Sequence, residues 1–163
     1  MKTIVTTLFL SFLSCCAFGQ DKAAIAAAEA ACGPRDLEFS VTAHESSHPT
    51  PMPDSGKALI YVVGAPGNTR LGADGKWLGA LKRGTYFYAS VDPGEHHLCA
   101  IGRIGLWSHV SLSELKAKEG ETYYFVVHVV GGYIADEFAL SQVDADQGKY
   151  LVAQVKFSES RRK

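Results

Sequence analysis

The sequence predicts an all-β protein, folded as a single β-sandwich with a short α-helix near its N-terminus. Three observations lead to this prediction. Between Ala58 and Ala100, short apolar runs alternate with turn-forming residues, among them the pair Asp74-Gly75. Thr122–Val130 is the most apolar run after the N-terminus and is rich in β-branched and aromatic residues. Asp21–Cys32, by contrast, is rich in alanine and has the composition of a helix.

Met1–Gly19 has the pattern of a secretory signal peptide. A positive charge and an apolar stretch lead to small residues at the −3 and −1 positions before Gln20. The alternative is acylation of Cys15 or Cys16, as in a lipoprotein, although the residues before both cysteines depart from a standard lipobox. We therefore predict export to the periplasm or the cell exterior, with membrane anchoring only if Cys15 or Cys16 is lipidated.

Charge and length limit the classes of function. The chain has 163 residues and a formal net charge of −1, and loss of residues 1–19 would remove one charged residue, Lys2. The remainder is long enough for one domain with a sizeable core. A nucleic-acid partner is not expected, because such a surface needs a basic stripe. The basic end Arg161-Arg162-Lys163 is interpreted as a solvated tail.

Two cysteines, Cys32 and Cys99, remain after the signal peptide. Oxidising compartments favour pairing, so we expect one disulfide, with two buried free thiols as the alternative. The chain-entropy model gives a loop of this length roughly 4 kcal/mol of stabilisation. Asp21 can cap the helix and Gly33-Pro34 ends it. The bridge would then pin the helix to a strand at His96–Ile101.

The remaining elements follow in order. Asp36–Ala43 alternates apolar and polar residues, as a half-buried strand does, and His44–Gly56 holds three prolines and is predicted to be a surface connector. In Thr85–Val91, Phe87 and its i+2 neighbours are assigned to the core. The expected organisation is a signal peptide (1–19), the N-terminal helix (20–35), a strand and Pro-rich connector (36–56), the β-sandwich (57–158) and a tail (159–163). About seven or eight strands would form two layers of the immunoglobulin or transthyretin kind.

Several motifs recur in the order of a known family. The runs are KALIYVV (57–63), GKWLGALKRGTYFYASVDPGEHHLCA (75–100) and EGETYYFVVHV (119–129). They resemble the DUF2846 family of bacterial envelope proteins, many of them lipoproteins. They also resemble PEGA-type surface domains, which share the hairpin and the Pro-Gly-x-His turn. The resemblance covers about half the chain. It implies a β-sandwich at the cell envelope and no settled activity.

No catalytic or metal-binding motif is evident. The sequence lacks a G-x-S-x-G elbow, an H-E-x-x-H motif and a phosphate-binding glycine loop. His96 and His97 are adjacent on a strand and would point to opposite faces. Asp144-Ala-Asp146 resembles the start of a calcium loop but lacks its later ligands, so helix capping over Ala145–Gln154 is the preferred interpretation. We predict no catalytic residues, no metal and no cofactor.

A binding role fits the composition better. Four aromatic residues are candidates for an exposed binding surface: Trp77, Tyr86, Tyr88 and Trp107. The alternative is that they complete the core. The favoured function is a secreted, non-enzymatic envelope domain that binds a protein partner or a cell-wall glycan. A structural accessory domain of an envelope assembly is the second possibility, and a hydrolase or metal-binding protein the third.

Overall fold

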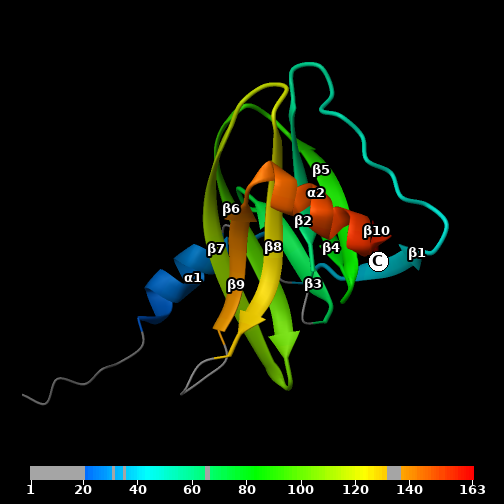
Figure 1. Cartoon of the computed structure of the whole chain (residues 1–163). Coiled ribbons are helices and arrows are strands. Elements are labelled where there is room, and N and C mark those ends of the chain that lie inside the picture. The colour runs from blue at the N-terminus through cyan, green and yellow to red at the C-terminus, as the bar shows by residue number, and fades with distance from the viewer. Residues whose placement is uncertain (1–20, 31, 35, 65–66, 132–136) are drawn as a thin grey trace, which may run out of the picture.

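The computed structural model describes residues 21–30, 32–34, 36–64, 67–131 and 137–163 (Figure 1). These residues form an all-β sandwich with two helices, so the predicted fold class is confirmed. The elements are α1 (Lys22–Ala30), β1 (Phe39–His44), β2 (Ala58–Val63), β3 (Thr69–Ala73), β4 (Lys76–Leu81), β5 (Thr85–Val91), β6 (Gly94–Ile104), β7 (Trp107–Ala117), β8 (Thr122–Val130), β9 (Glu137–Val143), α2 (Ala145–Gln154) and β10 (Lys156–Arg162).

The strands form two sheets that face each other. The six-stranded sheet has the order β1-β10-β5-β2-β8-β9, and the four-stranded sheet has the order β4-β3-β6-β7. Most neighbours are antiparallel, while β2 pairs with β8 and β10 with β5 in parallel. The main core between the sheets is aliphatic with three phenylalanines, and its fully buried members include Ile60, Val62, Leu71, Leu98 and Phe125. Phe87 belongs to this core, as its alternation predicts.

The turns carry the connections that their residues predict. Asp74 and Gly75 have φ angles of 51° and 77° between β3 and β4, as a two-residue type I′ hairpin requires. The turn at Asp92-Pro93 has a different role, because it takes the chain from β5 in the six-stranded sheet to β6 in the four-stranded sheet.

Serine hydroxyls join the two sheets where their edges meet. On one side, the Ala80 N–H donates to Ser160 Oγ at 3.1 Å, and Ser158 Oγ donates to the Ala80 carbonyl at 3.5 Å. On the other side, the Leu140 N–H donates to Ser111 Oγ at 2.9 Å. These bonds satisfy backbone groups of strands β4 and β9 that would otherwise remain open at a sheet edge.

The C-terminus is a strand, so the prediction of a tail at residues 159–163 is wrong. β10 lies between β1 and β5, and its register with β1 runs from Phe39 opposite Arg162 to His44 opposite Phe157. Consequently the strand predicted at Asp36–Ala43, observed as β1, also belongs to the sandwich. Backbone hydrogen bonds hold β1 and β10 together. The charged side chains at the end of β10 do not prevent this pairing, because charged residues are common near sheet edges.

An N-terminal helix and the Cys32–Cys99 disulfide form as predicted, but α1 ends at Ala30, so the bridge holds the turn after the helix and not the helix itself. Asp21 accepts hydrogen bonds from the N–H groups of Ala23 and Ala24 at 3.0 and 3.1 Å. Cys32 and Cys99 form a disulfide with their Cα atoms 4.8 Å apart. α1 buries none of its residues and extends away from the sandwich (Figure 1). Within the described ranges, no helix has the length and apolar character that a membrane span needs.

Gly72 provides a test of how Cys32 lies on the four-stranded sheet. A Cβ at Gly72 would collide with the backbone carbonyl of Cys32. We expect Gly72→Ala to lower the free energy of unfolding by about 1–3 kcal/mol, the usual effect of overpacking, in urea titrations. Gly67→Ala is the control, since its Cβ would have one neighbour, the Arg103 carbonyl oxygen, at 3.5 Å. Equal stability of the two variants would contradict this packing.

Candidate functional site

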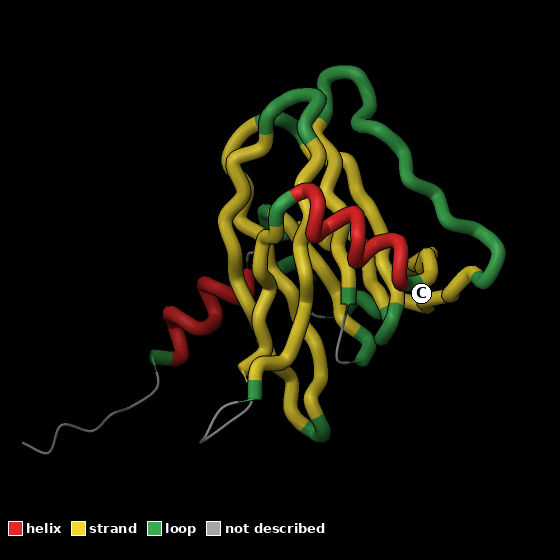
Figure 2. Tube along the Cα trace, in the orientation of Figure 1, coloured by secondary structure: helices red, strands yellow, loops and turns green. Residues whose placement is uncertain are grey.

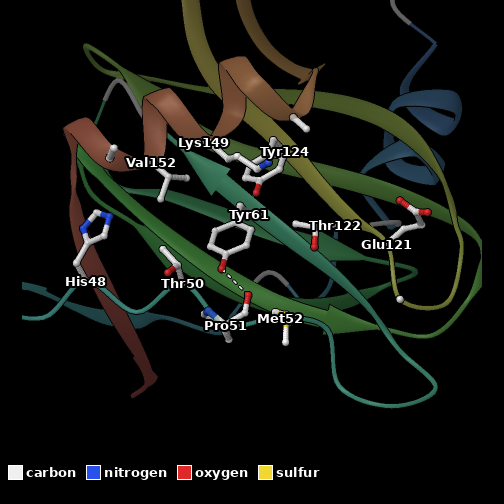
Figure 3. Close-up of a pocket in the computed structure, with 13 residues that line it drawn as sticks. His48, Thr50, Pro51, Met52, Tyr61, Glu121, Thr122, Tyr124, Lys149 and Val152 are labelled. Carbon is white, nitrogen blue, oxygen red and sulfur yellow. Dashed lines mark hydrogen bonds between the residues drawn. The ribbon is translucent and has the colours of Figure 1, made fainter.

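A groove lies on the outer face of the six-stranded sheet, between α2 and the connector of residues 45–57 (Figure 3). Figure 2 shows this connector as the long loop beside the sandwich. The groove encloses about 720 Å³. It is lined by His48, Thr50, Pro51, Met52, Tyr61, Gly120, Glu121, Thr122, Tyr124, Ala145, Lys149, Val152 and Ala153.

The floor of the groove exists because β2 is apolar on both faces. All six residues of β2 are buried. Ile60 and its i±2 neighbours face the main core, while Leu59, Tyr61 and Val63 face outward into a second apolar cluster with Tyr124 and others. Alternation along a strand requires that both faces be covered, and α2 and the connector provide this outer cover.

α2 lies directly on this floor. Asp144 caps the helix by accepting the Gln147 N–H at 2.9 Å, which confirms the predicted cap. Gly148 faces the ring of Tyr124 so closely that any Cβ would collide with the ring. Val152, one turn later, is buried in the same cluster. One wall of the groove is therefore held by close packing.

The connector forms the other wall and is held by two tyrosine hydroxyls. Tyr61 Oη donates to the Pro51 carbonyl at 2.9 Å, and Tyr86 Oη donates to the Pro49 carbonyl at 2.8 Å. These two carbonyls lie two residues apart, and Thr50 between them lines the groove. Proline lacks an N–H group, so the connector cannot close a normal strand ladder here and depends on these side chains.

The tyrosine hydroxyls that hold the connector stay protonated. Tyr61 and Tyr124 stack with centroids 5.3 Å apart. Burial, followed by the neighbouring tyrosines, raises the pKa of Tyr61 above its ordinary value. Burial, followed by Tyr88, raises the pKa of Tyr86 to about 12. Both hydroxyls therefore keep their protons, and their donor role, at physiological pH.

The rim of the groove carries the groups that a ligand would meet first. Met52 is 83% exposed, although its side chain is apolar. Lys149 and Glu121 are exposed, and within the described part of the chain neither side chain has an ion-pair partner. Figure 3 shows Lys149 beside Tyr124, with Glu121 toward the end of the groove opposite His48.

The predicted aromatic surface is wrong for two of its members. Trp77 is 5% exposed and Tyr86 is fully buried. The indole N–H of Trp77 donates to the Pro34 carbonyl at 2.7 Å, and its ring packs with the disulfide. Tyr88 is partly buried and stacks on Phe157. The Trp107 side chain lies outside the described residues.

The four candidates therefore do not form one site, because Trp77 belongs to the four-stranded sheet and Tyr86 and Tyr88 to the six-stranded sheet. The sequence interpretation missed Tyr61, Tyr124, Met52 and Lys149. One signal was available: an apolar run without alternation, as in Ala58–Val63, requires cover on both faces.

The closest histidine–carboxylate arrangement has no ring nitrogen left for a substrate. His96 Nδ1 lies 2.6 Å from Asp74 Oδ2, and His96 Nε2 lies 2.7 Å from the Asp92 carbonyl. Burial lowers the pKa of His96, but the hydrogen bonds to Asp74 and Asp92 outweigh it, and the net shift is upward. Burial raises the pKa of Asp74, while bonds from His96 and His97 reverse the effect and lower it. These hydrogen bonds fasten the β3–β4 hairpin, through Asp74, to strand β6.

Metal ligands do not gather either. No group of three or more His, Cys, Asp or Glu side chains that could hold a metal ion occurs among the described residues.

Comparisons of the chain with protein-family models, with curated proteins and with solved structures find no match. The resemblance to DUF2846 and PEGA-type domains therefore stays a prediction from the sequence motifs.

The Asp74–His96 pair predicts a pH-dependent stability. Asp74→Asn keeps an oxygen for the His97 N–H, bonded at 2.9 Å, and asparagine tolerates the positive φ. The raised pKa of His96 makes its contribution full below the unfolded pKa, and the contribution is lost as pH rises through the folded pKa. The lowered pKa of Asp74 makes its contribution present above the unfolded pKa of Asp74 and lost in acid.

We therefore expect Asp74→Asn to lower the free energy of unfolding by about 0.5–1 kcal/mol near pH 5.5, the range of a surface ion pair. The loss should be smaller near pH 8.5, because a smaller fraction of His96 carries a charge there. Urea titrations at both pH values measure it. Asp36→Asn is the control, because Asp36 is exposed and its side chain has no hydrogen bond or ion pair within the described residues. A loss that does not change with pH would contradict an ionised pair.

The two tyrosine hydroxyls predict a second stability effect. Tyr61→Phe and Tyr86→Phe should each lower the free energy of unfolding by about 1 kcal/mol, because each leaves a connector carbonyl without its donor. Limited proteolysis should also cut the connector faster in both variants. Tyr150→Phe, on an exposed residue of α2, is the control. Unchanged cleavage would show that the connector is held by other contacts.

Proposed function

We propose that the chain is an exported, non-catalytic binding domain that takes an extended segment of a protein partner into the groove between α2 and the connector. The observation that carries this proposal is an open groove of about 720 Å³ with an apolar interior and with charged side chains on its rim, Lys149 and Glu121, that form no ion pair with another described residue. Pockets of this size and character are the common form of ligand site.

The lining favours a peptide over a glycan. Sugar rings stack on exposed aromatic faces, whereas Tyr61 is 3% exposed and Tyr124 is 8% exposed. Pro51 and Met52 are exposed and instead offer apolar surface to an aliphatic side chain. Methionine also adapts its shape to the group that it contacts.

Charge adds a requirement on the partner. Lys149 lines the groove and has no carboxylate partner within the described part of the chain. An acidic residue next to the apolar anchor of a partner segment would pair with this exposed ammonium group at the rim. The expected partner segment is therefore extended, apolar at one position and acidic beside it.

Export and a non-catalytic role are the remaining parts of the proposal. The Cys32–Cys99 disulfide is compatible with an oxidising compartment, and the family resemblance points to the envelope. Membrane attachment would require acylation at Cys15 or Cys16, both outside the described residues. The engaged ring nitrogens of His96 support a role in binding and not in hydrolysis.

A structural accessory role is the second candidate, and one observation favours it. β1 lies at the edge of the six-stranded sheet. A strand from another protein could add there through backbone hydrogen bonds. This route would not use the groove, so groove substitutions separate the two candidates.

Selection of peptides on the disulfide-bonded protein tests the proposal. A phage-displayed peptide library should yield sequences in which an apolar residue neighbours an acidic residue. Lys149→Glu should weaken the selected peptides about five- to ten-fold by reversing an exposed charge. Met52→Ala should weaken them by removing contact area. Arg83→Glu, at an exposed turn outside the groove lining, is the matched control.

Thermal melting of each variant must stay unchanged for these losses to report on binding. Selected peptides that bind both groove variants as tightly as the original protein would contradict the groove and favour the β1 edge. Soluble peptidoglycan fragments form the comparison ligands. Fragment binding that Lys149→Glu or Met52→Ala abolishes would assign the groove to a glycan and overturn the peptide proposal.

A further inference from the structure

A second depression lies on the outer face of the four-stranded sheet, beside the start of β1, and encloses about 410 Å³. Its charged lining residues are Arg70, Arg103, Lys163 and Glu38. Three cations thus share the depression with one carboxylate. Asn68 and Ser108 add neutral polar side chains to the lining.

Arg70 is fixed in place before any ligand arrives. Its guanidinium lies 4.6 Å from the centroid of the Trp77 ring, a cation–π geometry. Its Nη1 donates to the Leu37 carbonyl at 2.7 Å. Trp77 is itself held by the bond to Pro34 and by packing on the disulfide. The long Arg70 side chain is therefore already ordered, with its guanidinium in a fixed position, before a ligand binds.

The guanidinium is also short of partners. Arg70 is partly buried. Within the described residues, its guanidinium forms no ion pair and one hydrogen bond. A guanidinium has five N–H donors, so most remain available. Burial lowers the pKa of Arg70 and the charge of Glu38 acts in the opposite direction. A partly desolvated cation gains more from an anion than a fully exposed cation does.

The other charges leave the balance positive. Lys163 Nζ lies 3.2 Å from Glu38 Oε2, and both side chains are largely exposed. Arg103 is exposed and has no ion pair within the described part of the chain. Among the three cations, only Lys163 lies within ion-pair distance of Glu38.

We propose that this depression binds an oxyanion group of a ligand, a phosphate or a carboxylate, with the Arg70 guanidinium as its principal donor and Arg103 as a second cation. The planar fork of arginine matches two oxygens of either group, which lysine does not. This site does not rest on the proposed function, because it shares no lining residue with the groove.

An NMR titration of the disulfide-bonded protein tests the site, with inorganic phosphate and acetate as the two probes at low ionic strength. We expect saturable shifts of the Arg70 Nε–H signal and of the backbone amides of Asn68 and Arg103. Added sodium chloride should weaken both probes, as screening requires. The probe that binds more tightly at equal charge identifies phosphate or carboxylate as the natural group.

Four variants separate an anion site from a structural arginine. Arg70→Lys keeps the charge but loses the fork and should weaken binding about ten-fold. Arg103→Gln should weaken binding about two- to five-fold. Glu38→Gln removes the competing carboxylate and should tighten binding by a similar factor. Arg83→Gln, exposed and outside the depression, is the matched control and should leave binding unchanged.

Shifts that do not saturate, or that spread over the whole surface, would overturn the proposal. So would equal binding by Arg70→Lys and the original protein. Because Arg70 also supports Trp77, the lysine variant could fail to fold. In that case Arg103→Gln and Glu38→Gln decide, since both residues are exposed. Binding that changes in neither variant would contradict the site.

Discussion

The structure depends on the burial of β2 on both of its faces. Ala58–Val63 is apolar throughout, and all six residues are buried. One face contributes to the core between the sheets, so the other face must be covered from outside. α2 crosses β2 and β8 (Figure 1) and covers part of it, while the connector covers another part. The groove is the space left between these two covers.

The four-stranded sheet has the same requirement and meets it differently. Its outer face is covered by the segment that follows α1, and the Cys32–Cys99 disulfide fastens this segment over Trp77. The disulfide is covalent and holds this segment on the sheet as long as it stays oxidised, whereas a hydrogen bond contributes only about 1 kcal/mol. The covalent cover is therefore the firmer one. The connector, held by Tyr61 and Tyr86 hydroxyls, opens at a smaller free-energy cost, and it borders the groove.

Local chemistry explains which features the sequence predicts. The Asp74-Gly75 hairpin, the caps at Asp21 and Asp144 and the disulfide each depend on a few residues with strong preferences. The second half of β10, predicted to be a tail, was missed because it becomes a strand through backbone pairing with β1, more than one hundred positions earlier. The sequence left open whether Trp77 is exposed or buried, for a similar reason. Its burial depends on the chain passing over that ring at Pro34, which composition does not record.

The distribution of satisfied and unsatisfied polar groups separates framework from candidate sites. His96 has an acceptor for each ring nitrogen. Ser160 and Ser111, which join the two sheets, bond to backbone groups. Such groups fix the fold and have little left to offer a ligand. Lys149 and Arg70 differ, because each lines a depression without a carboxylate partner among the described residues. In a chain with a net charge of only −1, binding would arise from these local imbalances and not from the overall field.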